Sequence, residues 1–296
     1  MHGSKLLRHA FLWSLAAGIA ATSGPGHTEP TIKTTNDIEY ARVAGQPLKL
    51  DLYQPATGAA PLLVWVHGGA WEAGSKSPMP LTGLVEHGYA VASLDFHPAS
   101  AARFPGQVHE IKAAIRFLRA SARRYGYDAR RIGILGASSG GHLAALVGTT
   151  NGQAELEGAL GEHPSESSAV QAIVSYFGAS NLTTILAQST PFGLGIRKPA
   201  LQRLLGAQPE ENEATAKLAS PVFQVDASDP PLLMLHGDQD PQMPINQSHE
   251  LQGQYESHGL ESHLIVVHGA AHGGDVFFAP QNTERVAAFL DAHLRE

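Results

Sequence analysis

The sequence contains no cysteine, and only 16% of its 296 residues are charged. Without cysteine there is no disulfide, no thiolate metal site and no cysteine nucleophile, so an ordinary hydrophobic core must stabilise the fold. The formal net charge of -7 comes without a basic stripe, which argues against nucleic acid as the main partner. The hydrophobic content of 43% is typical of a globular protein, and the length suits one large domain.

Long hydrophobic runs are lacking too, apart from a short one near the N-terminus. Lys5 and Arg8 precede the apolar stretch at 10–21, and small residues follow it. This stretch is shorter than the roughly 20 residues that span a bilayer, so it predicts a cleaved secretory signal and no stable membrane anchor. The alternative is a disordered N-terminus or a wrongly assigned start. Our expected organisation is a secreted or periplasmic protein with a signal peptide at 1–23, a Gly/Pro/Thr-rich tether at 24–36 and a folded domain at 37–296.

Past this region, short apolar runs alternate with helical patterns, and no internal repeat is found. Runs suited to buried strands are Leu62–Val66, Ala90–Asp95, Arg131–Leu135, Ala172–Tyr176, Pro231–Leu235 and His263–Val267, and an edge strand is expected at Leu48–Tyr53. Helices are expected at Gln107–Tyr125, Pro244–His258 and Asn282–Leu294, and another begins at Ser139. The alternation predicts an α/β fold, with a mostly parallel central sheet and helices on both faces. Two less regular segments, at 149–169 and 179–229, are candidate cap or insert segments.

Two adjacent serines follow one predicted strand, in the sequence GASSGG at 136–141. Gly136, Ser138 and Gly140 match GxSxG at a strand end, with an apolar helix after them. The sharp turn from strand to helix leaves the central serine strained and its hydroxyl projecting, so Ser138 is the candidate nucleophile. Ser139 does not fit the pattern, but its backbone N–H at the helix start can point at an oxyanion. Taken alone, the motif is equally compatible with a plain glycine-rich turn.

A serine nucleophile also needs a histidine base, a carboxylate that orients the base, and donors for the oxyanion. HGGAW at 67–71 follows a predicted strand, and its glycines let the backbone N–H groups of Gly69 and Ala70 approach an acyl oxygen. We expect the Trp71 indole to wall the site and to hydrogen-bond through its N–H. His67 is interpreted as a residue that organises this loop, not as the base. A simple tight turn would need the glycines but neither aromatic residue.

The candidate acid and base lie toward the C-terminus. The strand before His236 leads into HGDQDPQMP, where Asp240 lies deeper in the loop than Asp238. Asp240 is the candidate acid, and Asp238 is expected to accept backbone N–H bonds. His272, in GAAHGG beyond the last predicted strand, is the candidate base. The order Ser138, Asp240, His272 is the one expected for a GxSxG enzyme of this fold.

A metal site is the alternative use for these acidic and histidine residues. His236, Asp238 and Asp240 lie close in sequence, and the chain has 16 histidines. However, there is no HExxH and no three-ligand cluster at helical spacing, and most histidines serve no catalytic purpose. We therefore expect neither a metal nor an organic cofactor.

Together these motifs resemble the α/β-hydrolase superfamily, specifically the bacterial feruloyl-esterase-like and acetylxylan-esterase-like branch related to hormone-sensitive-lipase-type carboxylesterases. The resemblance runs from about Leu48 to the C-terminus, through VWVHGGAW at 64–71, FPGQVHEIKAAIRFLRASARRYG at 104–126, RIGILGASSGGHLAAL at 131–146, ASPVFQV at 219–225 and DPPLLMLHGDQDPQMP at 229–244. It implies an α/β-hydrolase fold with nucleophile, acid and base at Ser138, Asp240 and His272, and oxyanion donors at Gly69, Ala70 and Ser139. The chain departs from these relatives at 95–97, which reads Asp-Phe-His where they carry Asp-Tyr-Arg, and at Asn181, where an aspartate is common.

We accordingly expect an exported serine carboxylic-ester hydrolase that forms an acyl-enzyme intermediate. Its substrates would be small or plant-wall-type acyl esters, free or linked to a polysaccharide. The same residues would also serve an amidase of the arylformamidase type, and a non-catalytic binding protein on a hydrolase scaffold is a third hypothesis. A prolyl-oligopeptidase-type peptidase is disfavoured because 296 residues leave no room for its extra domain. Acyl and alcohol specificity and the oligomeric state are left open by the sequence.

Overall fold

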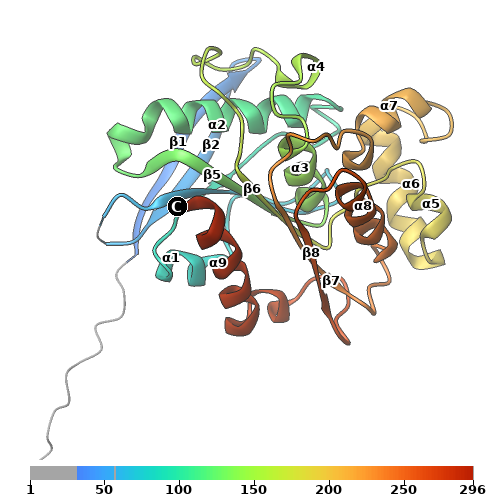
Figure 1. Ribbon diagram of the computed structural model, residues 1–296. Coiled ribbons are helices and arrows are strands. Elements are labelled where there is room, and N and C mark those ends of the chain that lie inside the picture. The colour runs from blue at the N-terminus through green and yellow to red at the C-terminus, as the bar shows by residue number, and fades with distance from the viewer. Residues whose placement is uncertain (1–31, 57, 296) are drawn as a thin grey trace, which may run out of the picture.

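The computed structural model describes residues 32–56 and 58–295, and an eight-stranded sheet forms its centre (Figure 1). The strands are β1 (Lys33–Val43), β2 (Gln46–Gln54), β3 (Pro61–Val66), β4 (Ala90–Leu94), β5 (Asp128–Ala137), β6 (Ala172–Tyr176), β7 (Leu232–Gly237) and β8 (Ser262–Val267). They lie in the order β1-β2-β4-β3-β5-β6-β7-β8. β2 pairs antiparallel with β1 and β4, and the pairs from β4 through β8 are parallel. The predicted mostly parallel sheet is confirmed.

Helices cover both faces of this sheet, as predicted (Figure 1). α1 (Thr82–Glu86) and α9 (Pro280–Leu294) pack on one face, and α2 (Gly106–Tyr125), α3 (Ser139–Gly148) and α8 (Asn246–Ser257) pack on the other. Because side chains alternate along a strand, β3 contributes Leu62, Val64 and Val66 to one core and Leu63 and Trp65 to the other. A strand buried on both faces therefore reads as a continuous apolar run, which is why the sequence identified these strands.

The N-terminal part of the sheet differs from the prediction. β1 begins at Lys33, so residues 33–36 belong to the sheet and not to the tether expected at 24–36. Most β1 side chains are exposed, and the strand has no apolar run that the sequence analysis could detect. Since β1 pairs along the length of β2, β2 is an inner strand and not the predicted edge strand. The signal peptide expected at 1–23 lies outside the described residues.

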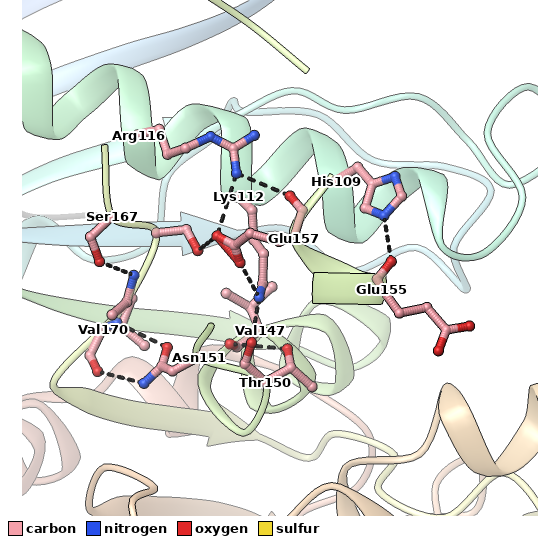
Figure 2. Close-up of polar contacts among 12 residues, drawn as sticks. His109, Lys112, Arg116, Val147, Thr150, Asn151, Glu155, Glu157, Ser167 and Val170 are labelled. Atoms are coloured by element: carbon pink, nitrogen blue, oxygen red, sulfur yellow. Dashed lines mark hydrogen bonds and ion pairs between the residues drawn. The ribbon is translucent and has the colours of Figure 1, made fainter. Parts of the chain in front are cut away.

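The segment at 149–169, predicted as one of two cap or insert segments, packs on α2 (Figure 2). It contains α4 (Ala154–Glu157) and joins the end of α3 to the start of β6. The buried Lys112 donates to Thr150 O (2.5 Å) and to the carboxylate of Glu157 (2.9 Å). The buried Arg116 donates to the carbonyl of Glu157 (3.0 Å). A connection from a helix end to the next parallel strand lies at the amino ends of the strands, away from the edge where α/β folds bind ligands, so this segment is not a cover over the site.

The second predicted insert, at 179–229, follows the carboxyl end of β6 and lies beside the site. It contains α5 (Ile185–Gln188), α6 (Pro191–Leu205), α7 (Glu213–Leu218) and the short helix η1 (Pro221–Phe223). Its contact with the loop after β7 includes the hydrogen bond from Thr190 Oγ1 to Pro241 O (2.6 Å). A last short helix, η2 (Asp275–Phe278), precedes α9. Within 32–56 and 58–295, no helix combines the length and apolarity needed to cross a membrane.

Candidate active site

The turn between β5 and α3 has the strained geometry that the GxSxG pattern predicts. Ser138 has φ 56° and ψ -121°, a conformation unusual for a residue with a side chain. Its N–H donates to Tyr176 O (2.9 Å), and its carbonyl accepts from His142 N (3.0 Å). A Cβ at Gly140 would lie 2.1 Å from Val66 O, so only glycine permits this contact between the turn and β3. Close packing of two backbones therefore fixes the position of Ser138.

The structure brings together three side chains that lie far apart in sequence. His272 Nε2 lies 2.8 Å from Ser138 Oγ, and His272 Nδ1 lies 2.6 Å from Asp240 Oδ2. The ring of Phe177 meets the imidazole edge-on, with 4.9 Å between the ring centres. With Nδ1 donating to the carboxylate, Nε2 of a neutral imidazole is left as an acceptor for the Ser138 hydroxyl. This chain of hydrogen bonds can remove a proton from Ser138 as the serine attacks an electrophile.

Asp240 is buried, with a side chain only 1% exposed, and is well supplied with donors. Its Oδ1 accepts from Gln242 N and Met243 N, each at 2.8 Å, while Oδ2 faces His272. Burial by itself would raise the pKa of Asp240, but the neighbouring His236 (3.6 Å), the hydrogen bonds from His272 and Met243 N and the charge of His272 outweigh burial and lower the pKa well below its usual range. Asp240 is therefore ionised at neutral pH and can stabilise a positive imidazole.

The two neighbouring candidates for a metal site make other contacts. Asp238 accepts from Gly269 N (2.7 Å), as predicted, and pairs with His268 (2.8 Å). His236 is buried between Ser248 Oγ (2.7 Å) and Met243 O (3.0 Å). Among the residues that the structure describes, no group of three or more His, Asp or Glu side chains could hold a metal ion.

The HGGAW loop packs against the Ser138 turn. A Cβ at Gly68 would lie 3.2 Å from Ser138 Cβ, and Gly69, Ala70 and Trp71 have φ values of 127°, 54° and 63°. Three successive positive φ values give the loop an unusual path beside the serine. Among the hydrogen bonds of residues 32–56 and 58–295, none is donated by the N–H of Gly69, Ala70 or Ser139. These backbone donors remain available for a ligand near Ser138.

His67 lies at the base of the same loop. Its ring stacks on Phe96, with 4.3 Å between centres and 9° between planes, and Nδ1 lies 2.8 Å from Gly68 O. Burial lowers the pKa of His67, which keeps the ring neutral at pH 7. Among the described residues, no hydrogen bond joins the His67 side chain to Ser138, His272 or Asp240, so its position agrees with a role in organising the loop.

Trp71 does not wall an open site, contrary to the prediction. The indole is 1% exposed, and its N–H donates to Nδ1 of His142 (3.1 Å) inside the protein. His142 was missed in the sequence, although it lies four residues after Ser138 in GGHLA. Its Nε2 is 2.7 Å from Ala219 O, and burial lowers its pKa to about 4. A neutral His142 thus joins the HGGAW loop, α3 and the second insert.

Comparison with known proteins agrees with this arrangement. A family model named BD-FAE matches residues 50–255. The chain is 30% identical to esterase LipC of Mycobacterium tuberculosis over 228 residues, which are 74% of this chain and 54% of that protein. A solved structure described as a truncated carbohydrate esterase from gut microbiota has a TM-score of 0.79 at 30% identity, and covers 93% of this chain and 100% of its own. A bifunctional GH43-CE protein of Bacteroides eggerthii has a TM-score of 0.78 at 35% identity, over 88% of this chain and 35% of its own.

The parallel sheet, the turn at Ser138 and these likenesses place the chain in an α/β-hydrolase family that includes esterases. It belongs to the BD-FAE family, whose model matches more than half of its length. The chain spans little more than half the length of the curated relatives it matches, 54% for LipC.

Proposed function

We propose that this protein is an exported serine carboxylic-ester hydrolase. The observation that carries the proposal is the hydrogen-bond chain from Ser138 Oγ through His272 to the buried, ionised Asp240. Ser138 Oγ attacks the ester carbonyl while its proton passes to His272 Nε2, and Asp240 stabilises the imidazolium. The C–O bond to the alcohol then breaks, and the leaving alcohol takes the proton from His272. Water then attacks the acyl-enzyme while its proton passes to His272. The bond between the acyl carbon and Ser138 Oγ breaks and Oγ takes the proton back from His272, which releases the carboxylic acid and free Ser138.

The negative oxygen that forms during both attacks needs hydrogen-bond donors. The N–H groups of Gly69, Ala70 and Ser139 lie on the loop and the helix start that pack around Ser138. Ser139 is the first residue of α3, so the positive end of the helix dipole adds to its N–H. Each donor is expected to contribute roughly 3 kcal/mol to transition-state stabilisation.

The substrate class that we propose is a short acyl ester of a carbohydrate. Support comes from the two similar structures described as carbohydrate esterase and GH43-CE, at 30% and 35% identity. The proposal of export is supported by the signal-like sequence at 1–23, and an exported hydrolase would meet polysaccharides outside the cell.

Replacement of the serine tests the proposed function. Ser138→Ala should abolish hydrolysis of p-nitrophenyl acetate and of an acetylated xylooligosaccharide, because no other group supplies the attacking oxygen. Ser257→Ala, at an exposed serine on α8, is the matched control and should hydrolyse both esters at the wild-type rate. Undiminished turnover by the Ser138→Ala protein would refute the assignment, and faster cleavage of p-nitroacetanilide than of the acetate ester would favour an amidase.

A further inference from the structure

Arg197, on α6, is a buried charge that the proposed mechanism does not yet use. The residue is 1% exposed, and its guanidinium donates to Gln242 O (3.0 Å). Its Nε is buried and has no hydrogen-bond partner among the described residues. Burying a charge with so few partners is costly, so the fold gains little stability from it. The role of this charge is therefore indicated by its location beside the loop that carries Asp240, and not by a contribution to stability.

The guanidinium lies against the loop that carries Asp240. Gln242, whose carbonyl accepts from Arg197, donates its own N–H to Asp240 Oδ1 (2.8 Å). The start of α6 approaches the same loop, since a Cβ at Gly193 would lie 3.1 Å from Pro241 O and 3.0 Å from Gln242 O. α6 thus approaches the carbonyl groups of Pro241 and Gln242, the two residues that follow Asp240. The hydrogen bond from Arg197 fixes the carbonyl of Gln242.

We propose that Arg197 is a positioning residue for the hydrolysis: through its hydrogen bond to Gln242 O it fixes the loop that carries Asp240. The inference rests on the proposed function. Burial lowers the pKa of Arg197 to about 10, with the Asp240 carboxylate acting in the opposite direction, so the side chain is charged at neutral pH. A charged guanidinium is a stronger donor than a neutral group, which strengthens its hold on Gln242 O.

Few other ionisable groups surround this arrangement. His236 of β7 lies 3.6 Å from Asp240 and is already bonded to Ser248 and Met243 O. α5, which packs on α6, carries no ionisable side chain. Glu250 of α8 is bonded to Asn181, Thr184 and Gln188. Arg197 is therefore the charged side chain of α6 that holds the Asp240 loop.

The experiment measures kcat and KM for p-nitrophenyl acetate separately. Arg197→Gln should lower kcat about tenfold, because a looser loop no longer holds Asp240 against His272. Its KM should stay within about twofold of the wild-type value, because the loop positions the acid and not the substrate. Arg197→Lys, which keeps a charged donor without the planar geometry, should recover part of kcat.

Lys198→Gln is the matched control, because it removes the neighbouring positive charge from the exposed side of α6. It should reproduce the wild-type kcat and KM. An Arg197→Gln kcat equal to that of the control would overturn the inference, as would failure of Arg197→Gln and Arg197→Met to fold, which would make Arg197 a core residue only. Ser138→Ala separates the two proposals: activity surviving in it refutes the proposed function, whereas activity lost there with an unchanged Arg197→Gln kcat refutes only this inference.

Discussion

The two predicted insert segments are similarly irregular in sequence, but they are attached to different parts of the protein. The segment at 149–169 is anchored on α2, where its Glu157 meets the buried Lys112 and Arg116. The segment at 179–229 is anchored on the site itself, through Arg197 at the Asp240 loop and Ala219 at His142. In a parallel sheet, a connection that leaves a strand starts at the carboxyl edge of the sheet, where Ser138, Asp240 and His272 lie. A connection that returns to a strand ends at the opposite edge. The first segment should therefore affect stability alone, and the second should affect stability and turnover.

The largest effect should come from the ion pairs of the first segment. Glu157→Gln leaves Lys112 and Arg116 buried without a countercharge, so the free energy of unfolding at pH 7 should fall by about 3 kcal/mol. Urea denaturation measures the change, and kcat/KM of the folded variant should equal that of the wild type. Glu155→Gln, at an exposed residue of the same segment, is the control with unchanged stability. A loss of turnover in folded Glu157→Gln protein would break the distinction between the two segments.

Lowering the pH should remove most of the difference in unfolding free energy between the wild type and Glu157→Gln. Burial would raise the pKa of Glu157, but hydrogen bonds from Lys112 and Ser168 and the charges of Lys112 and Arg116 outweigh it and lower the pKa. A carboxyl whose folded pKa is depressed stabilises the protein fully above its unfolded pKa of about 4.3, and the stabilisation disappears as the pH falls through the folded value. Urea denaturation at several pH values should show wild type and Glu157→Gln converging below about pH 4. A difference that stays constant down to pH 3 would rule out this ionic origin.

A smaller loss of stability, with a loss of activity, is expected at His142 in the second attachment. His142→Leu leaves the Trp71 N–H and Ala219 O without partners, which should cost about 2 kcal/mol. Because Trp71 ends the HGGAW loop, kcat for p-nitrophenyl acetate should also fall about tenfold. His109→Leu removes an exposed histidine-to-carbonyl contact from the first segment and should leave kcat unchanged. Equal kcat values in the two variants would show that the loop does not depend on His142.

The smallest effect should come from an exposed pair within the second segment. Lys217 pairs with Glu213 across one turn of α7 (2.7 Å), and both side chains are largely exposed. Lys217→Met should therefore change neither the thermal midpoint nor kcat/KM measurably. A clear drop in either would mean that the surface of this segment, and not only its buried attachments, supports the site.

Much of the fold could be predicted because the five central strands, β3 to β7, contain buried apolar runs. β1 could not, because its side chains are largely exposed and its pairing with β2 is set by backbone bonds that leave no pattern in the sequence. The helices of the second segment were missed for a related reason. α6 contains Pro199 and glycines and buries an arginine, so it lacks a simple amphipathic period.

The residues of the hydrogen-bond chain could be predicted because the chemistry restricts them to serine, histidine and aspartate at strand ends. Ser138, Asp240 and His272 each follow the carboxyl end of a parallel strand, where loops converge. The supporting residues could not, because their partners are backbone carbonyls. Any residue can present a carbonyl, so neither His142 at Ala219 nor Arg197 at Gln242 leaves a recognisable pair in the sequence. Trp71 was misplaced because an indole fits a buried hydrogen bond as well as an open wall.

The sequence separation of 134 positions between Ser138 and His272 has a consequence for biosynthesis. A ribosome-bound chain that has emerged only through β7 carries its attacking hydroxyl but has no partner to accept the proton. On the proposed function, a chain that ends before His272 is therefore inert toward acyl esters.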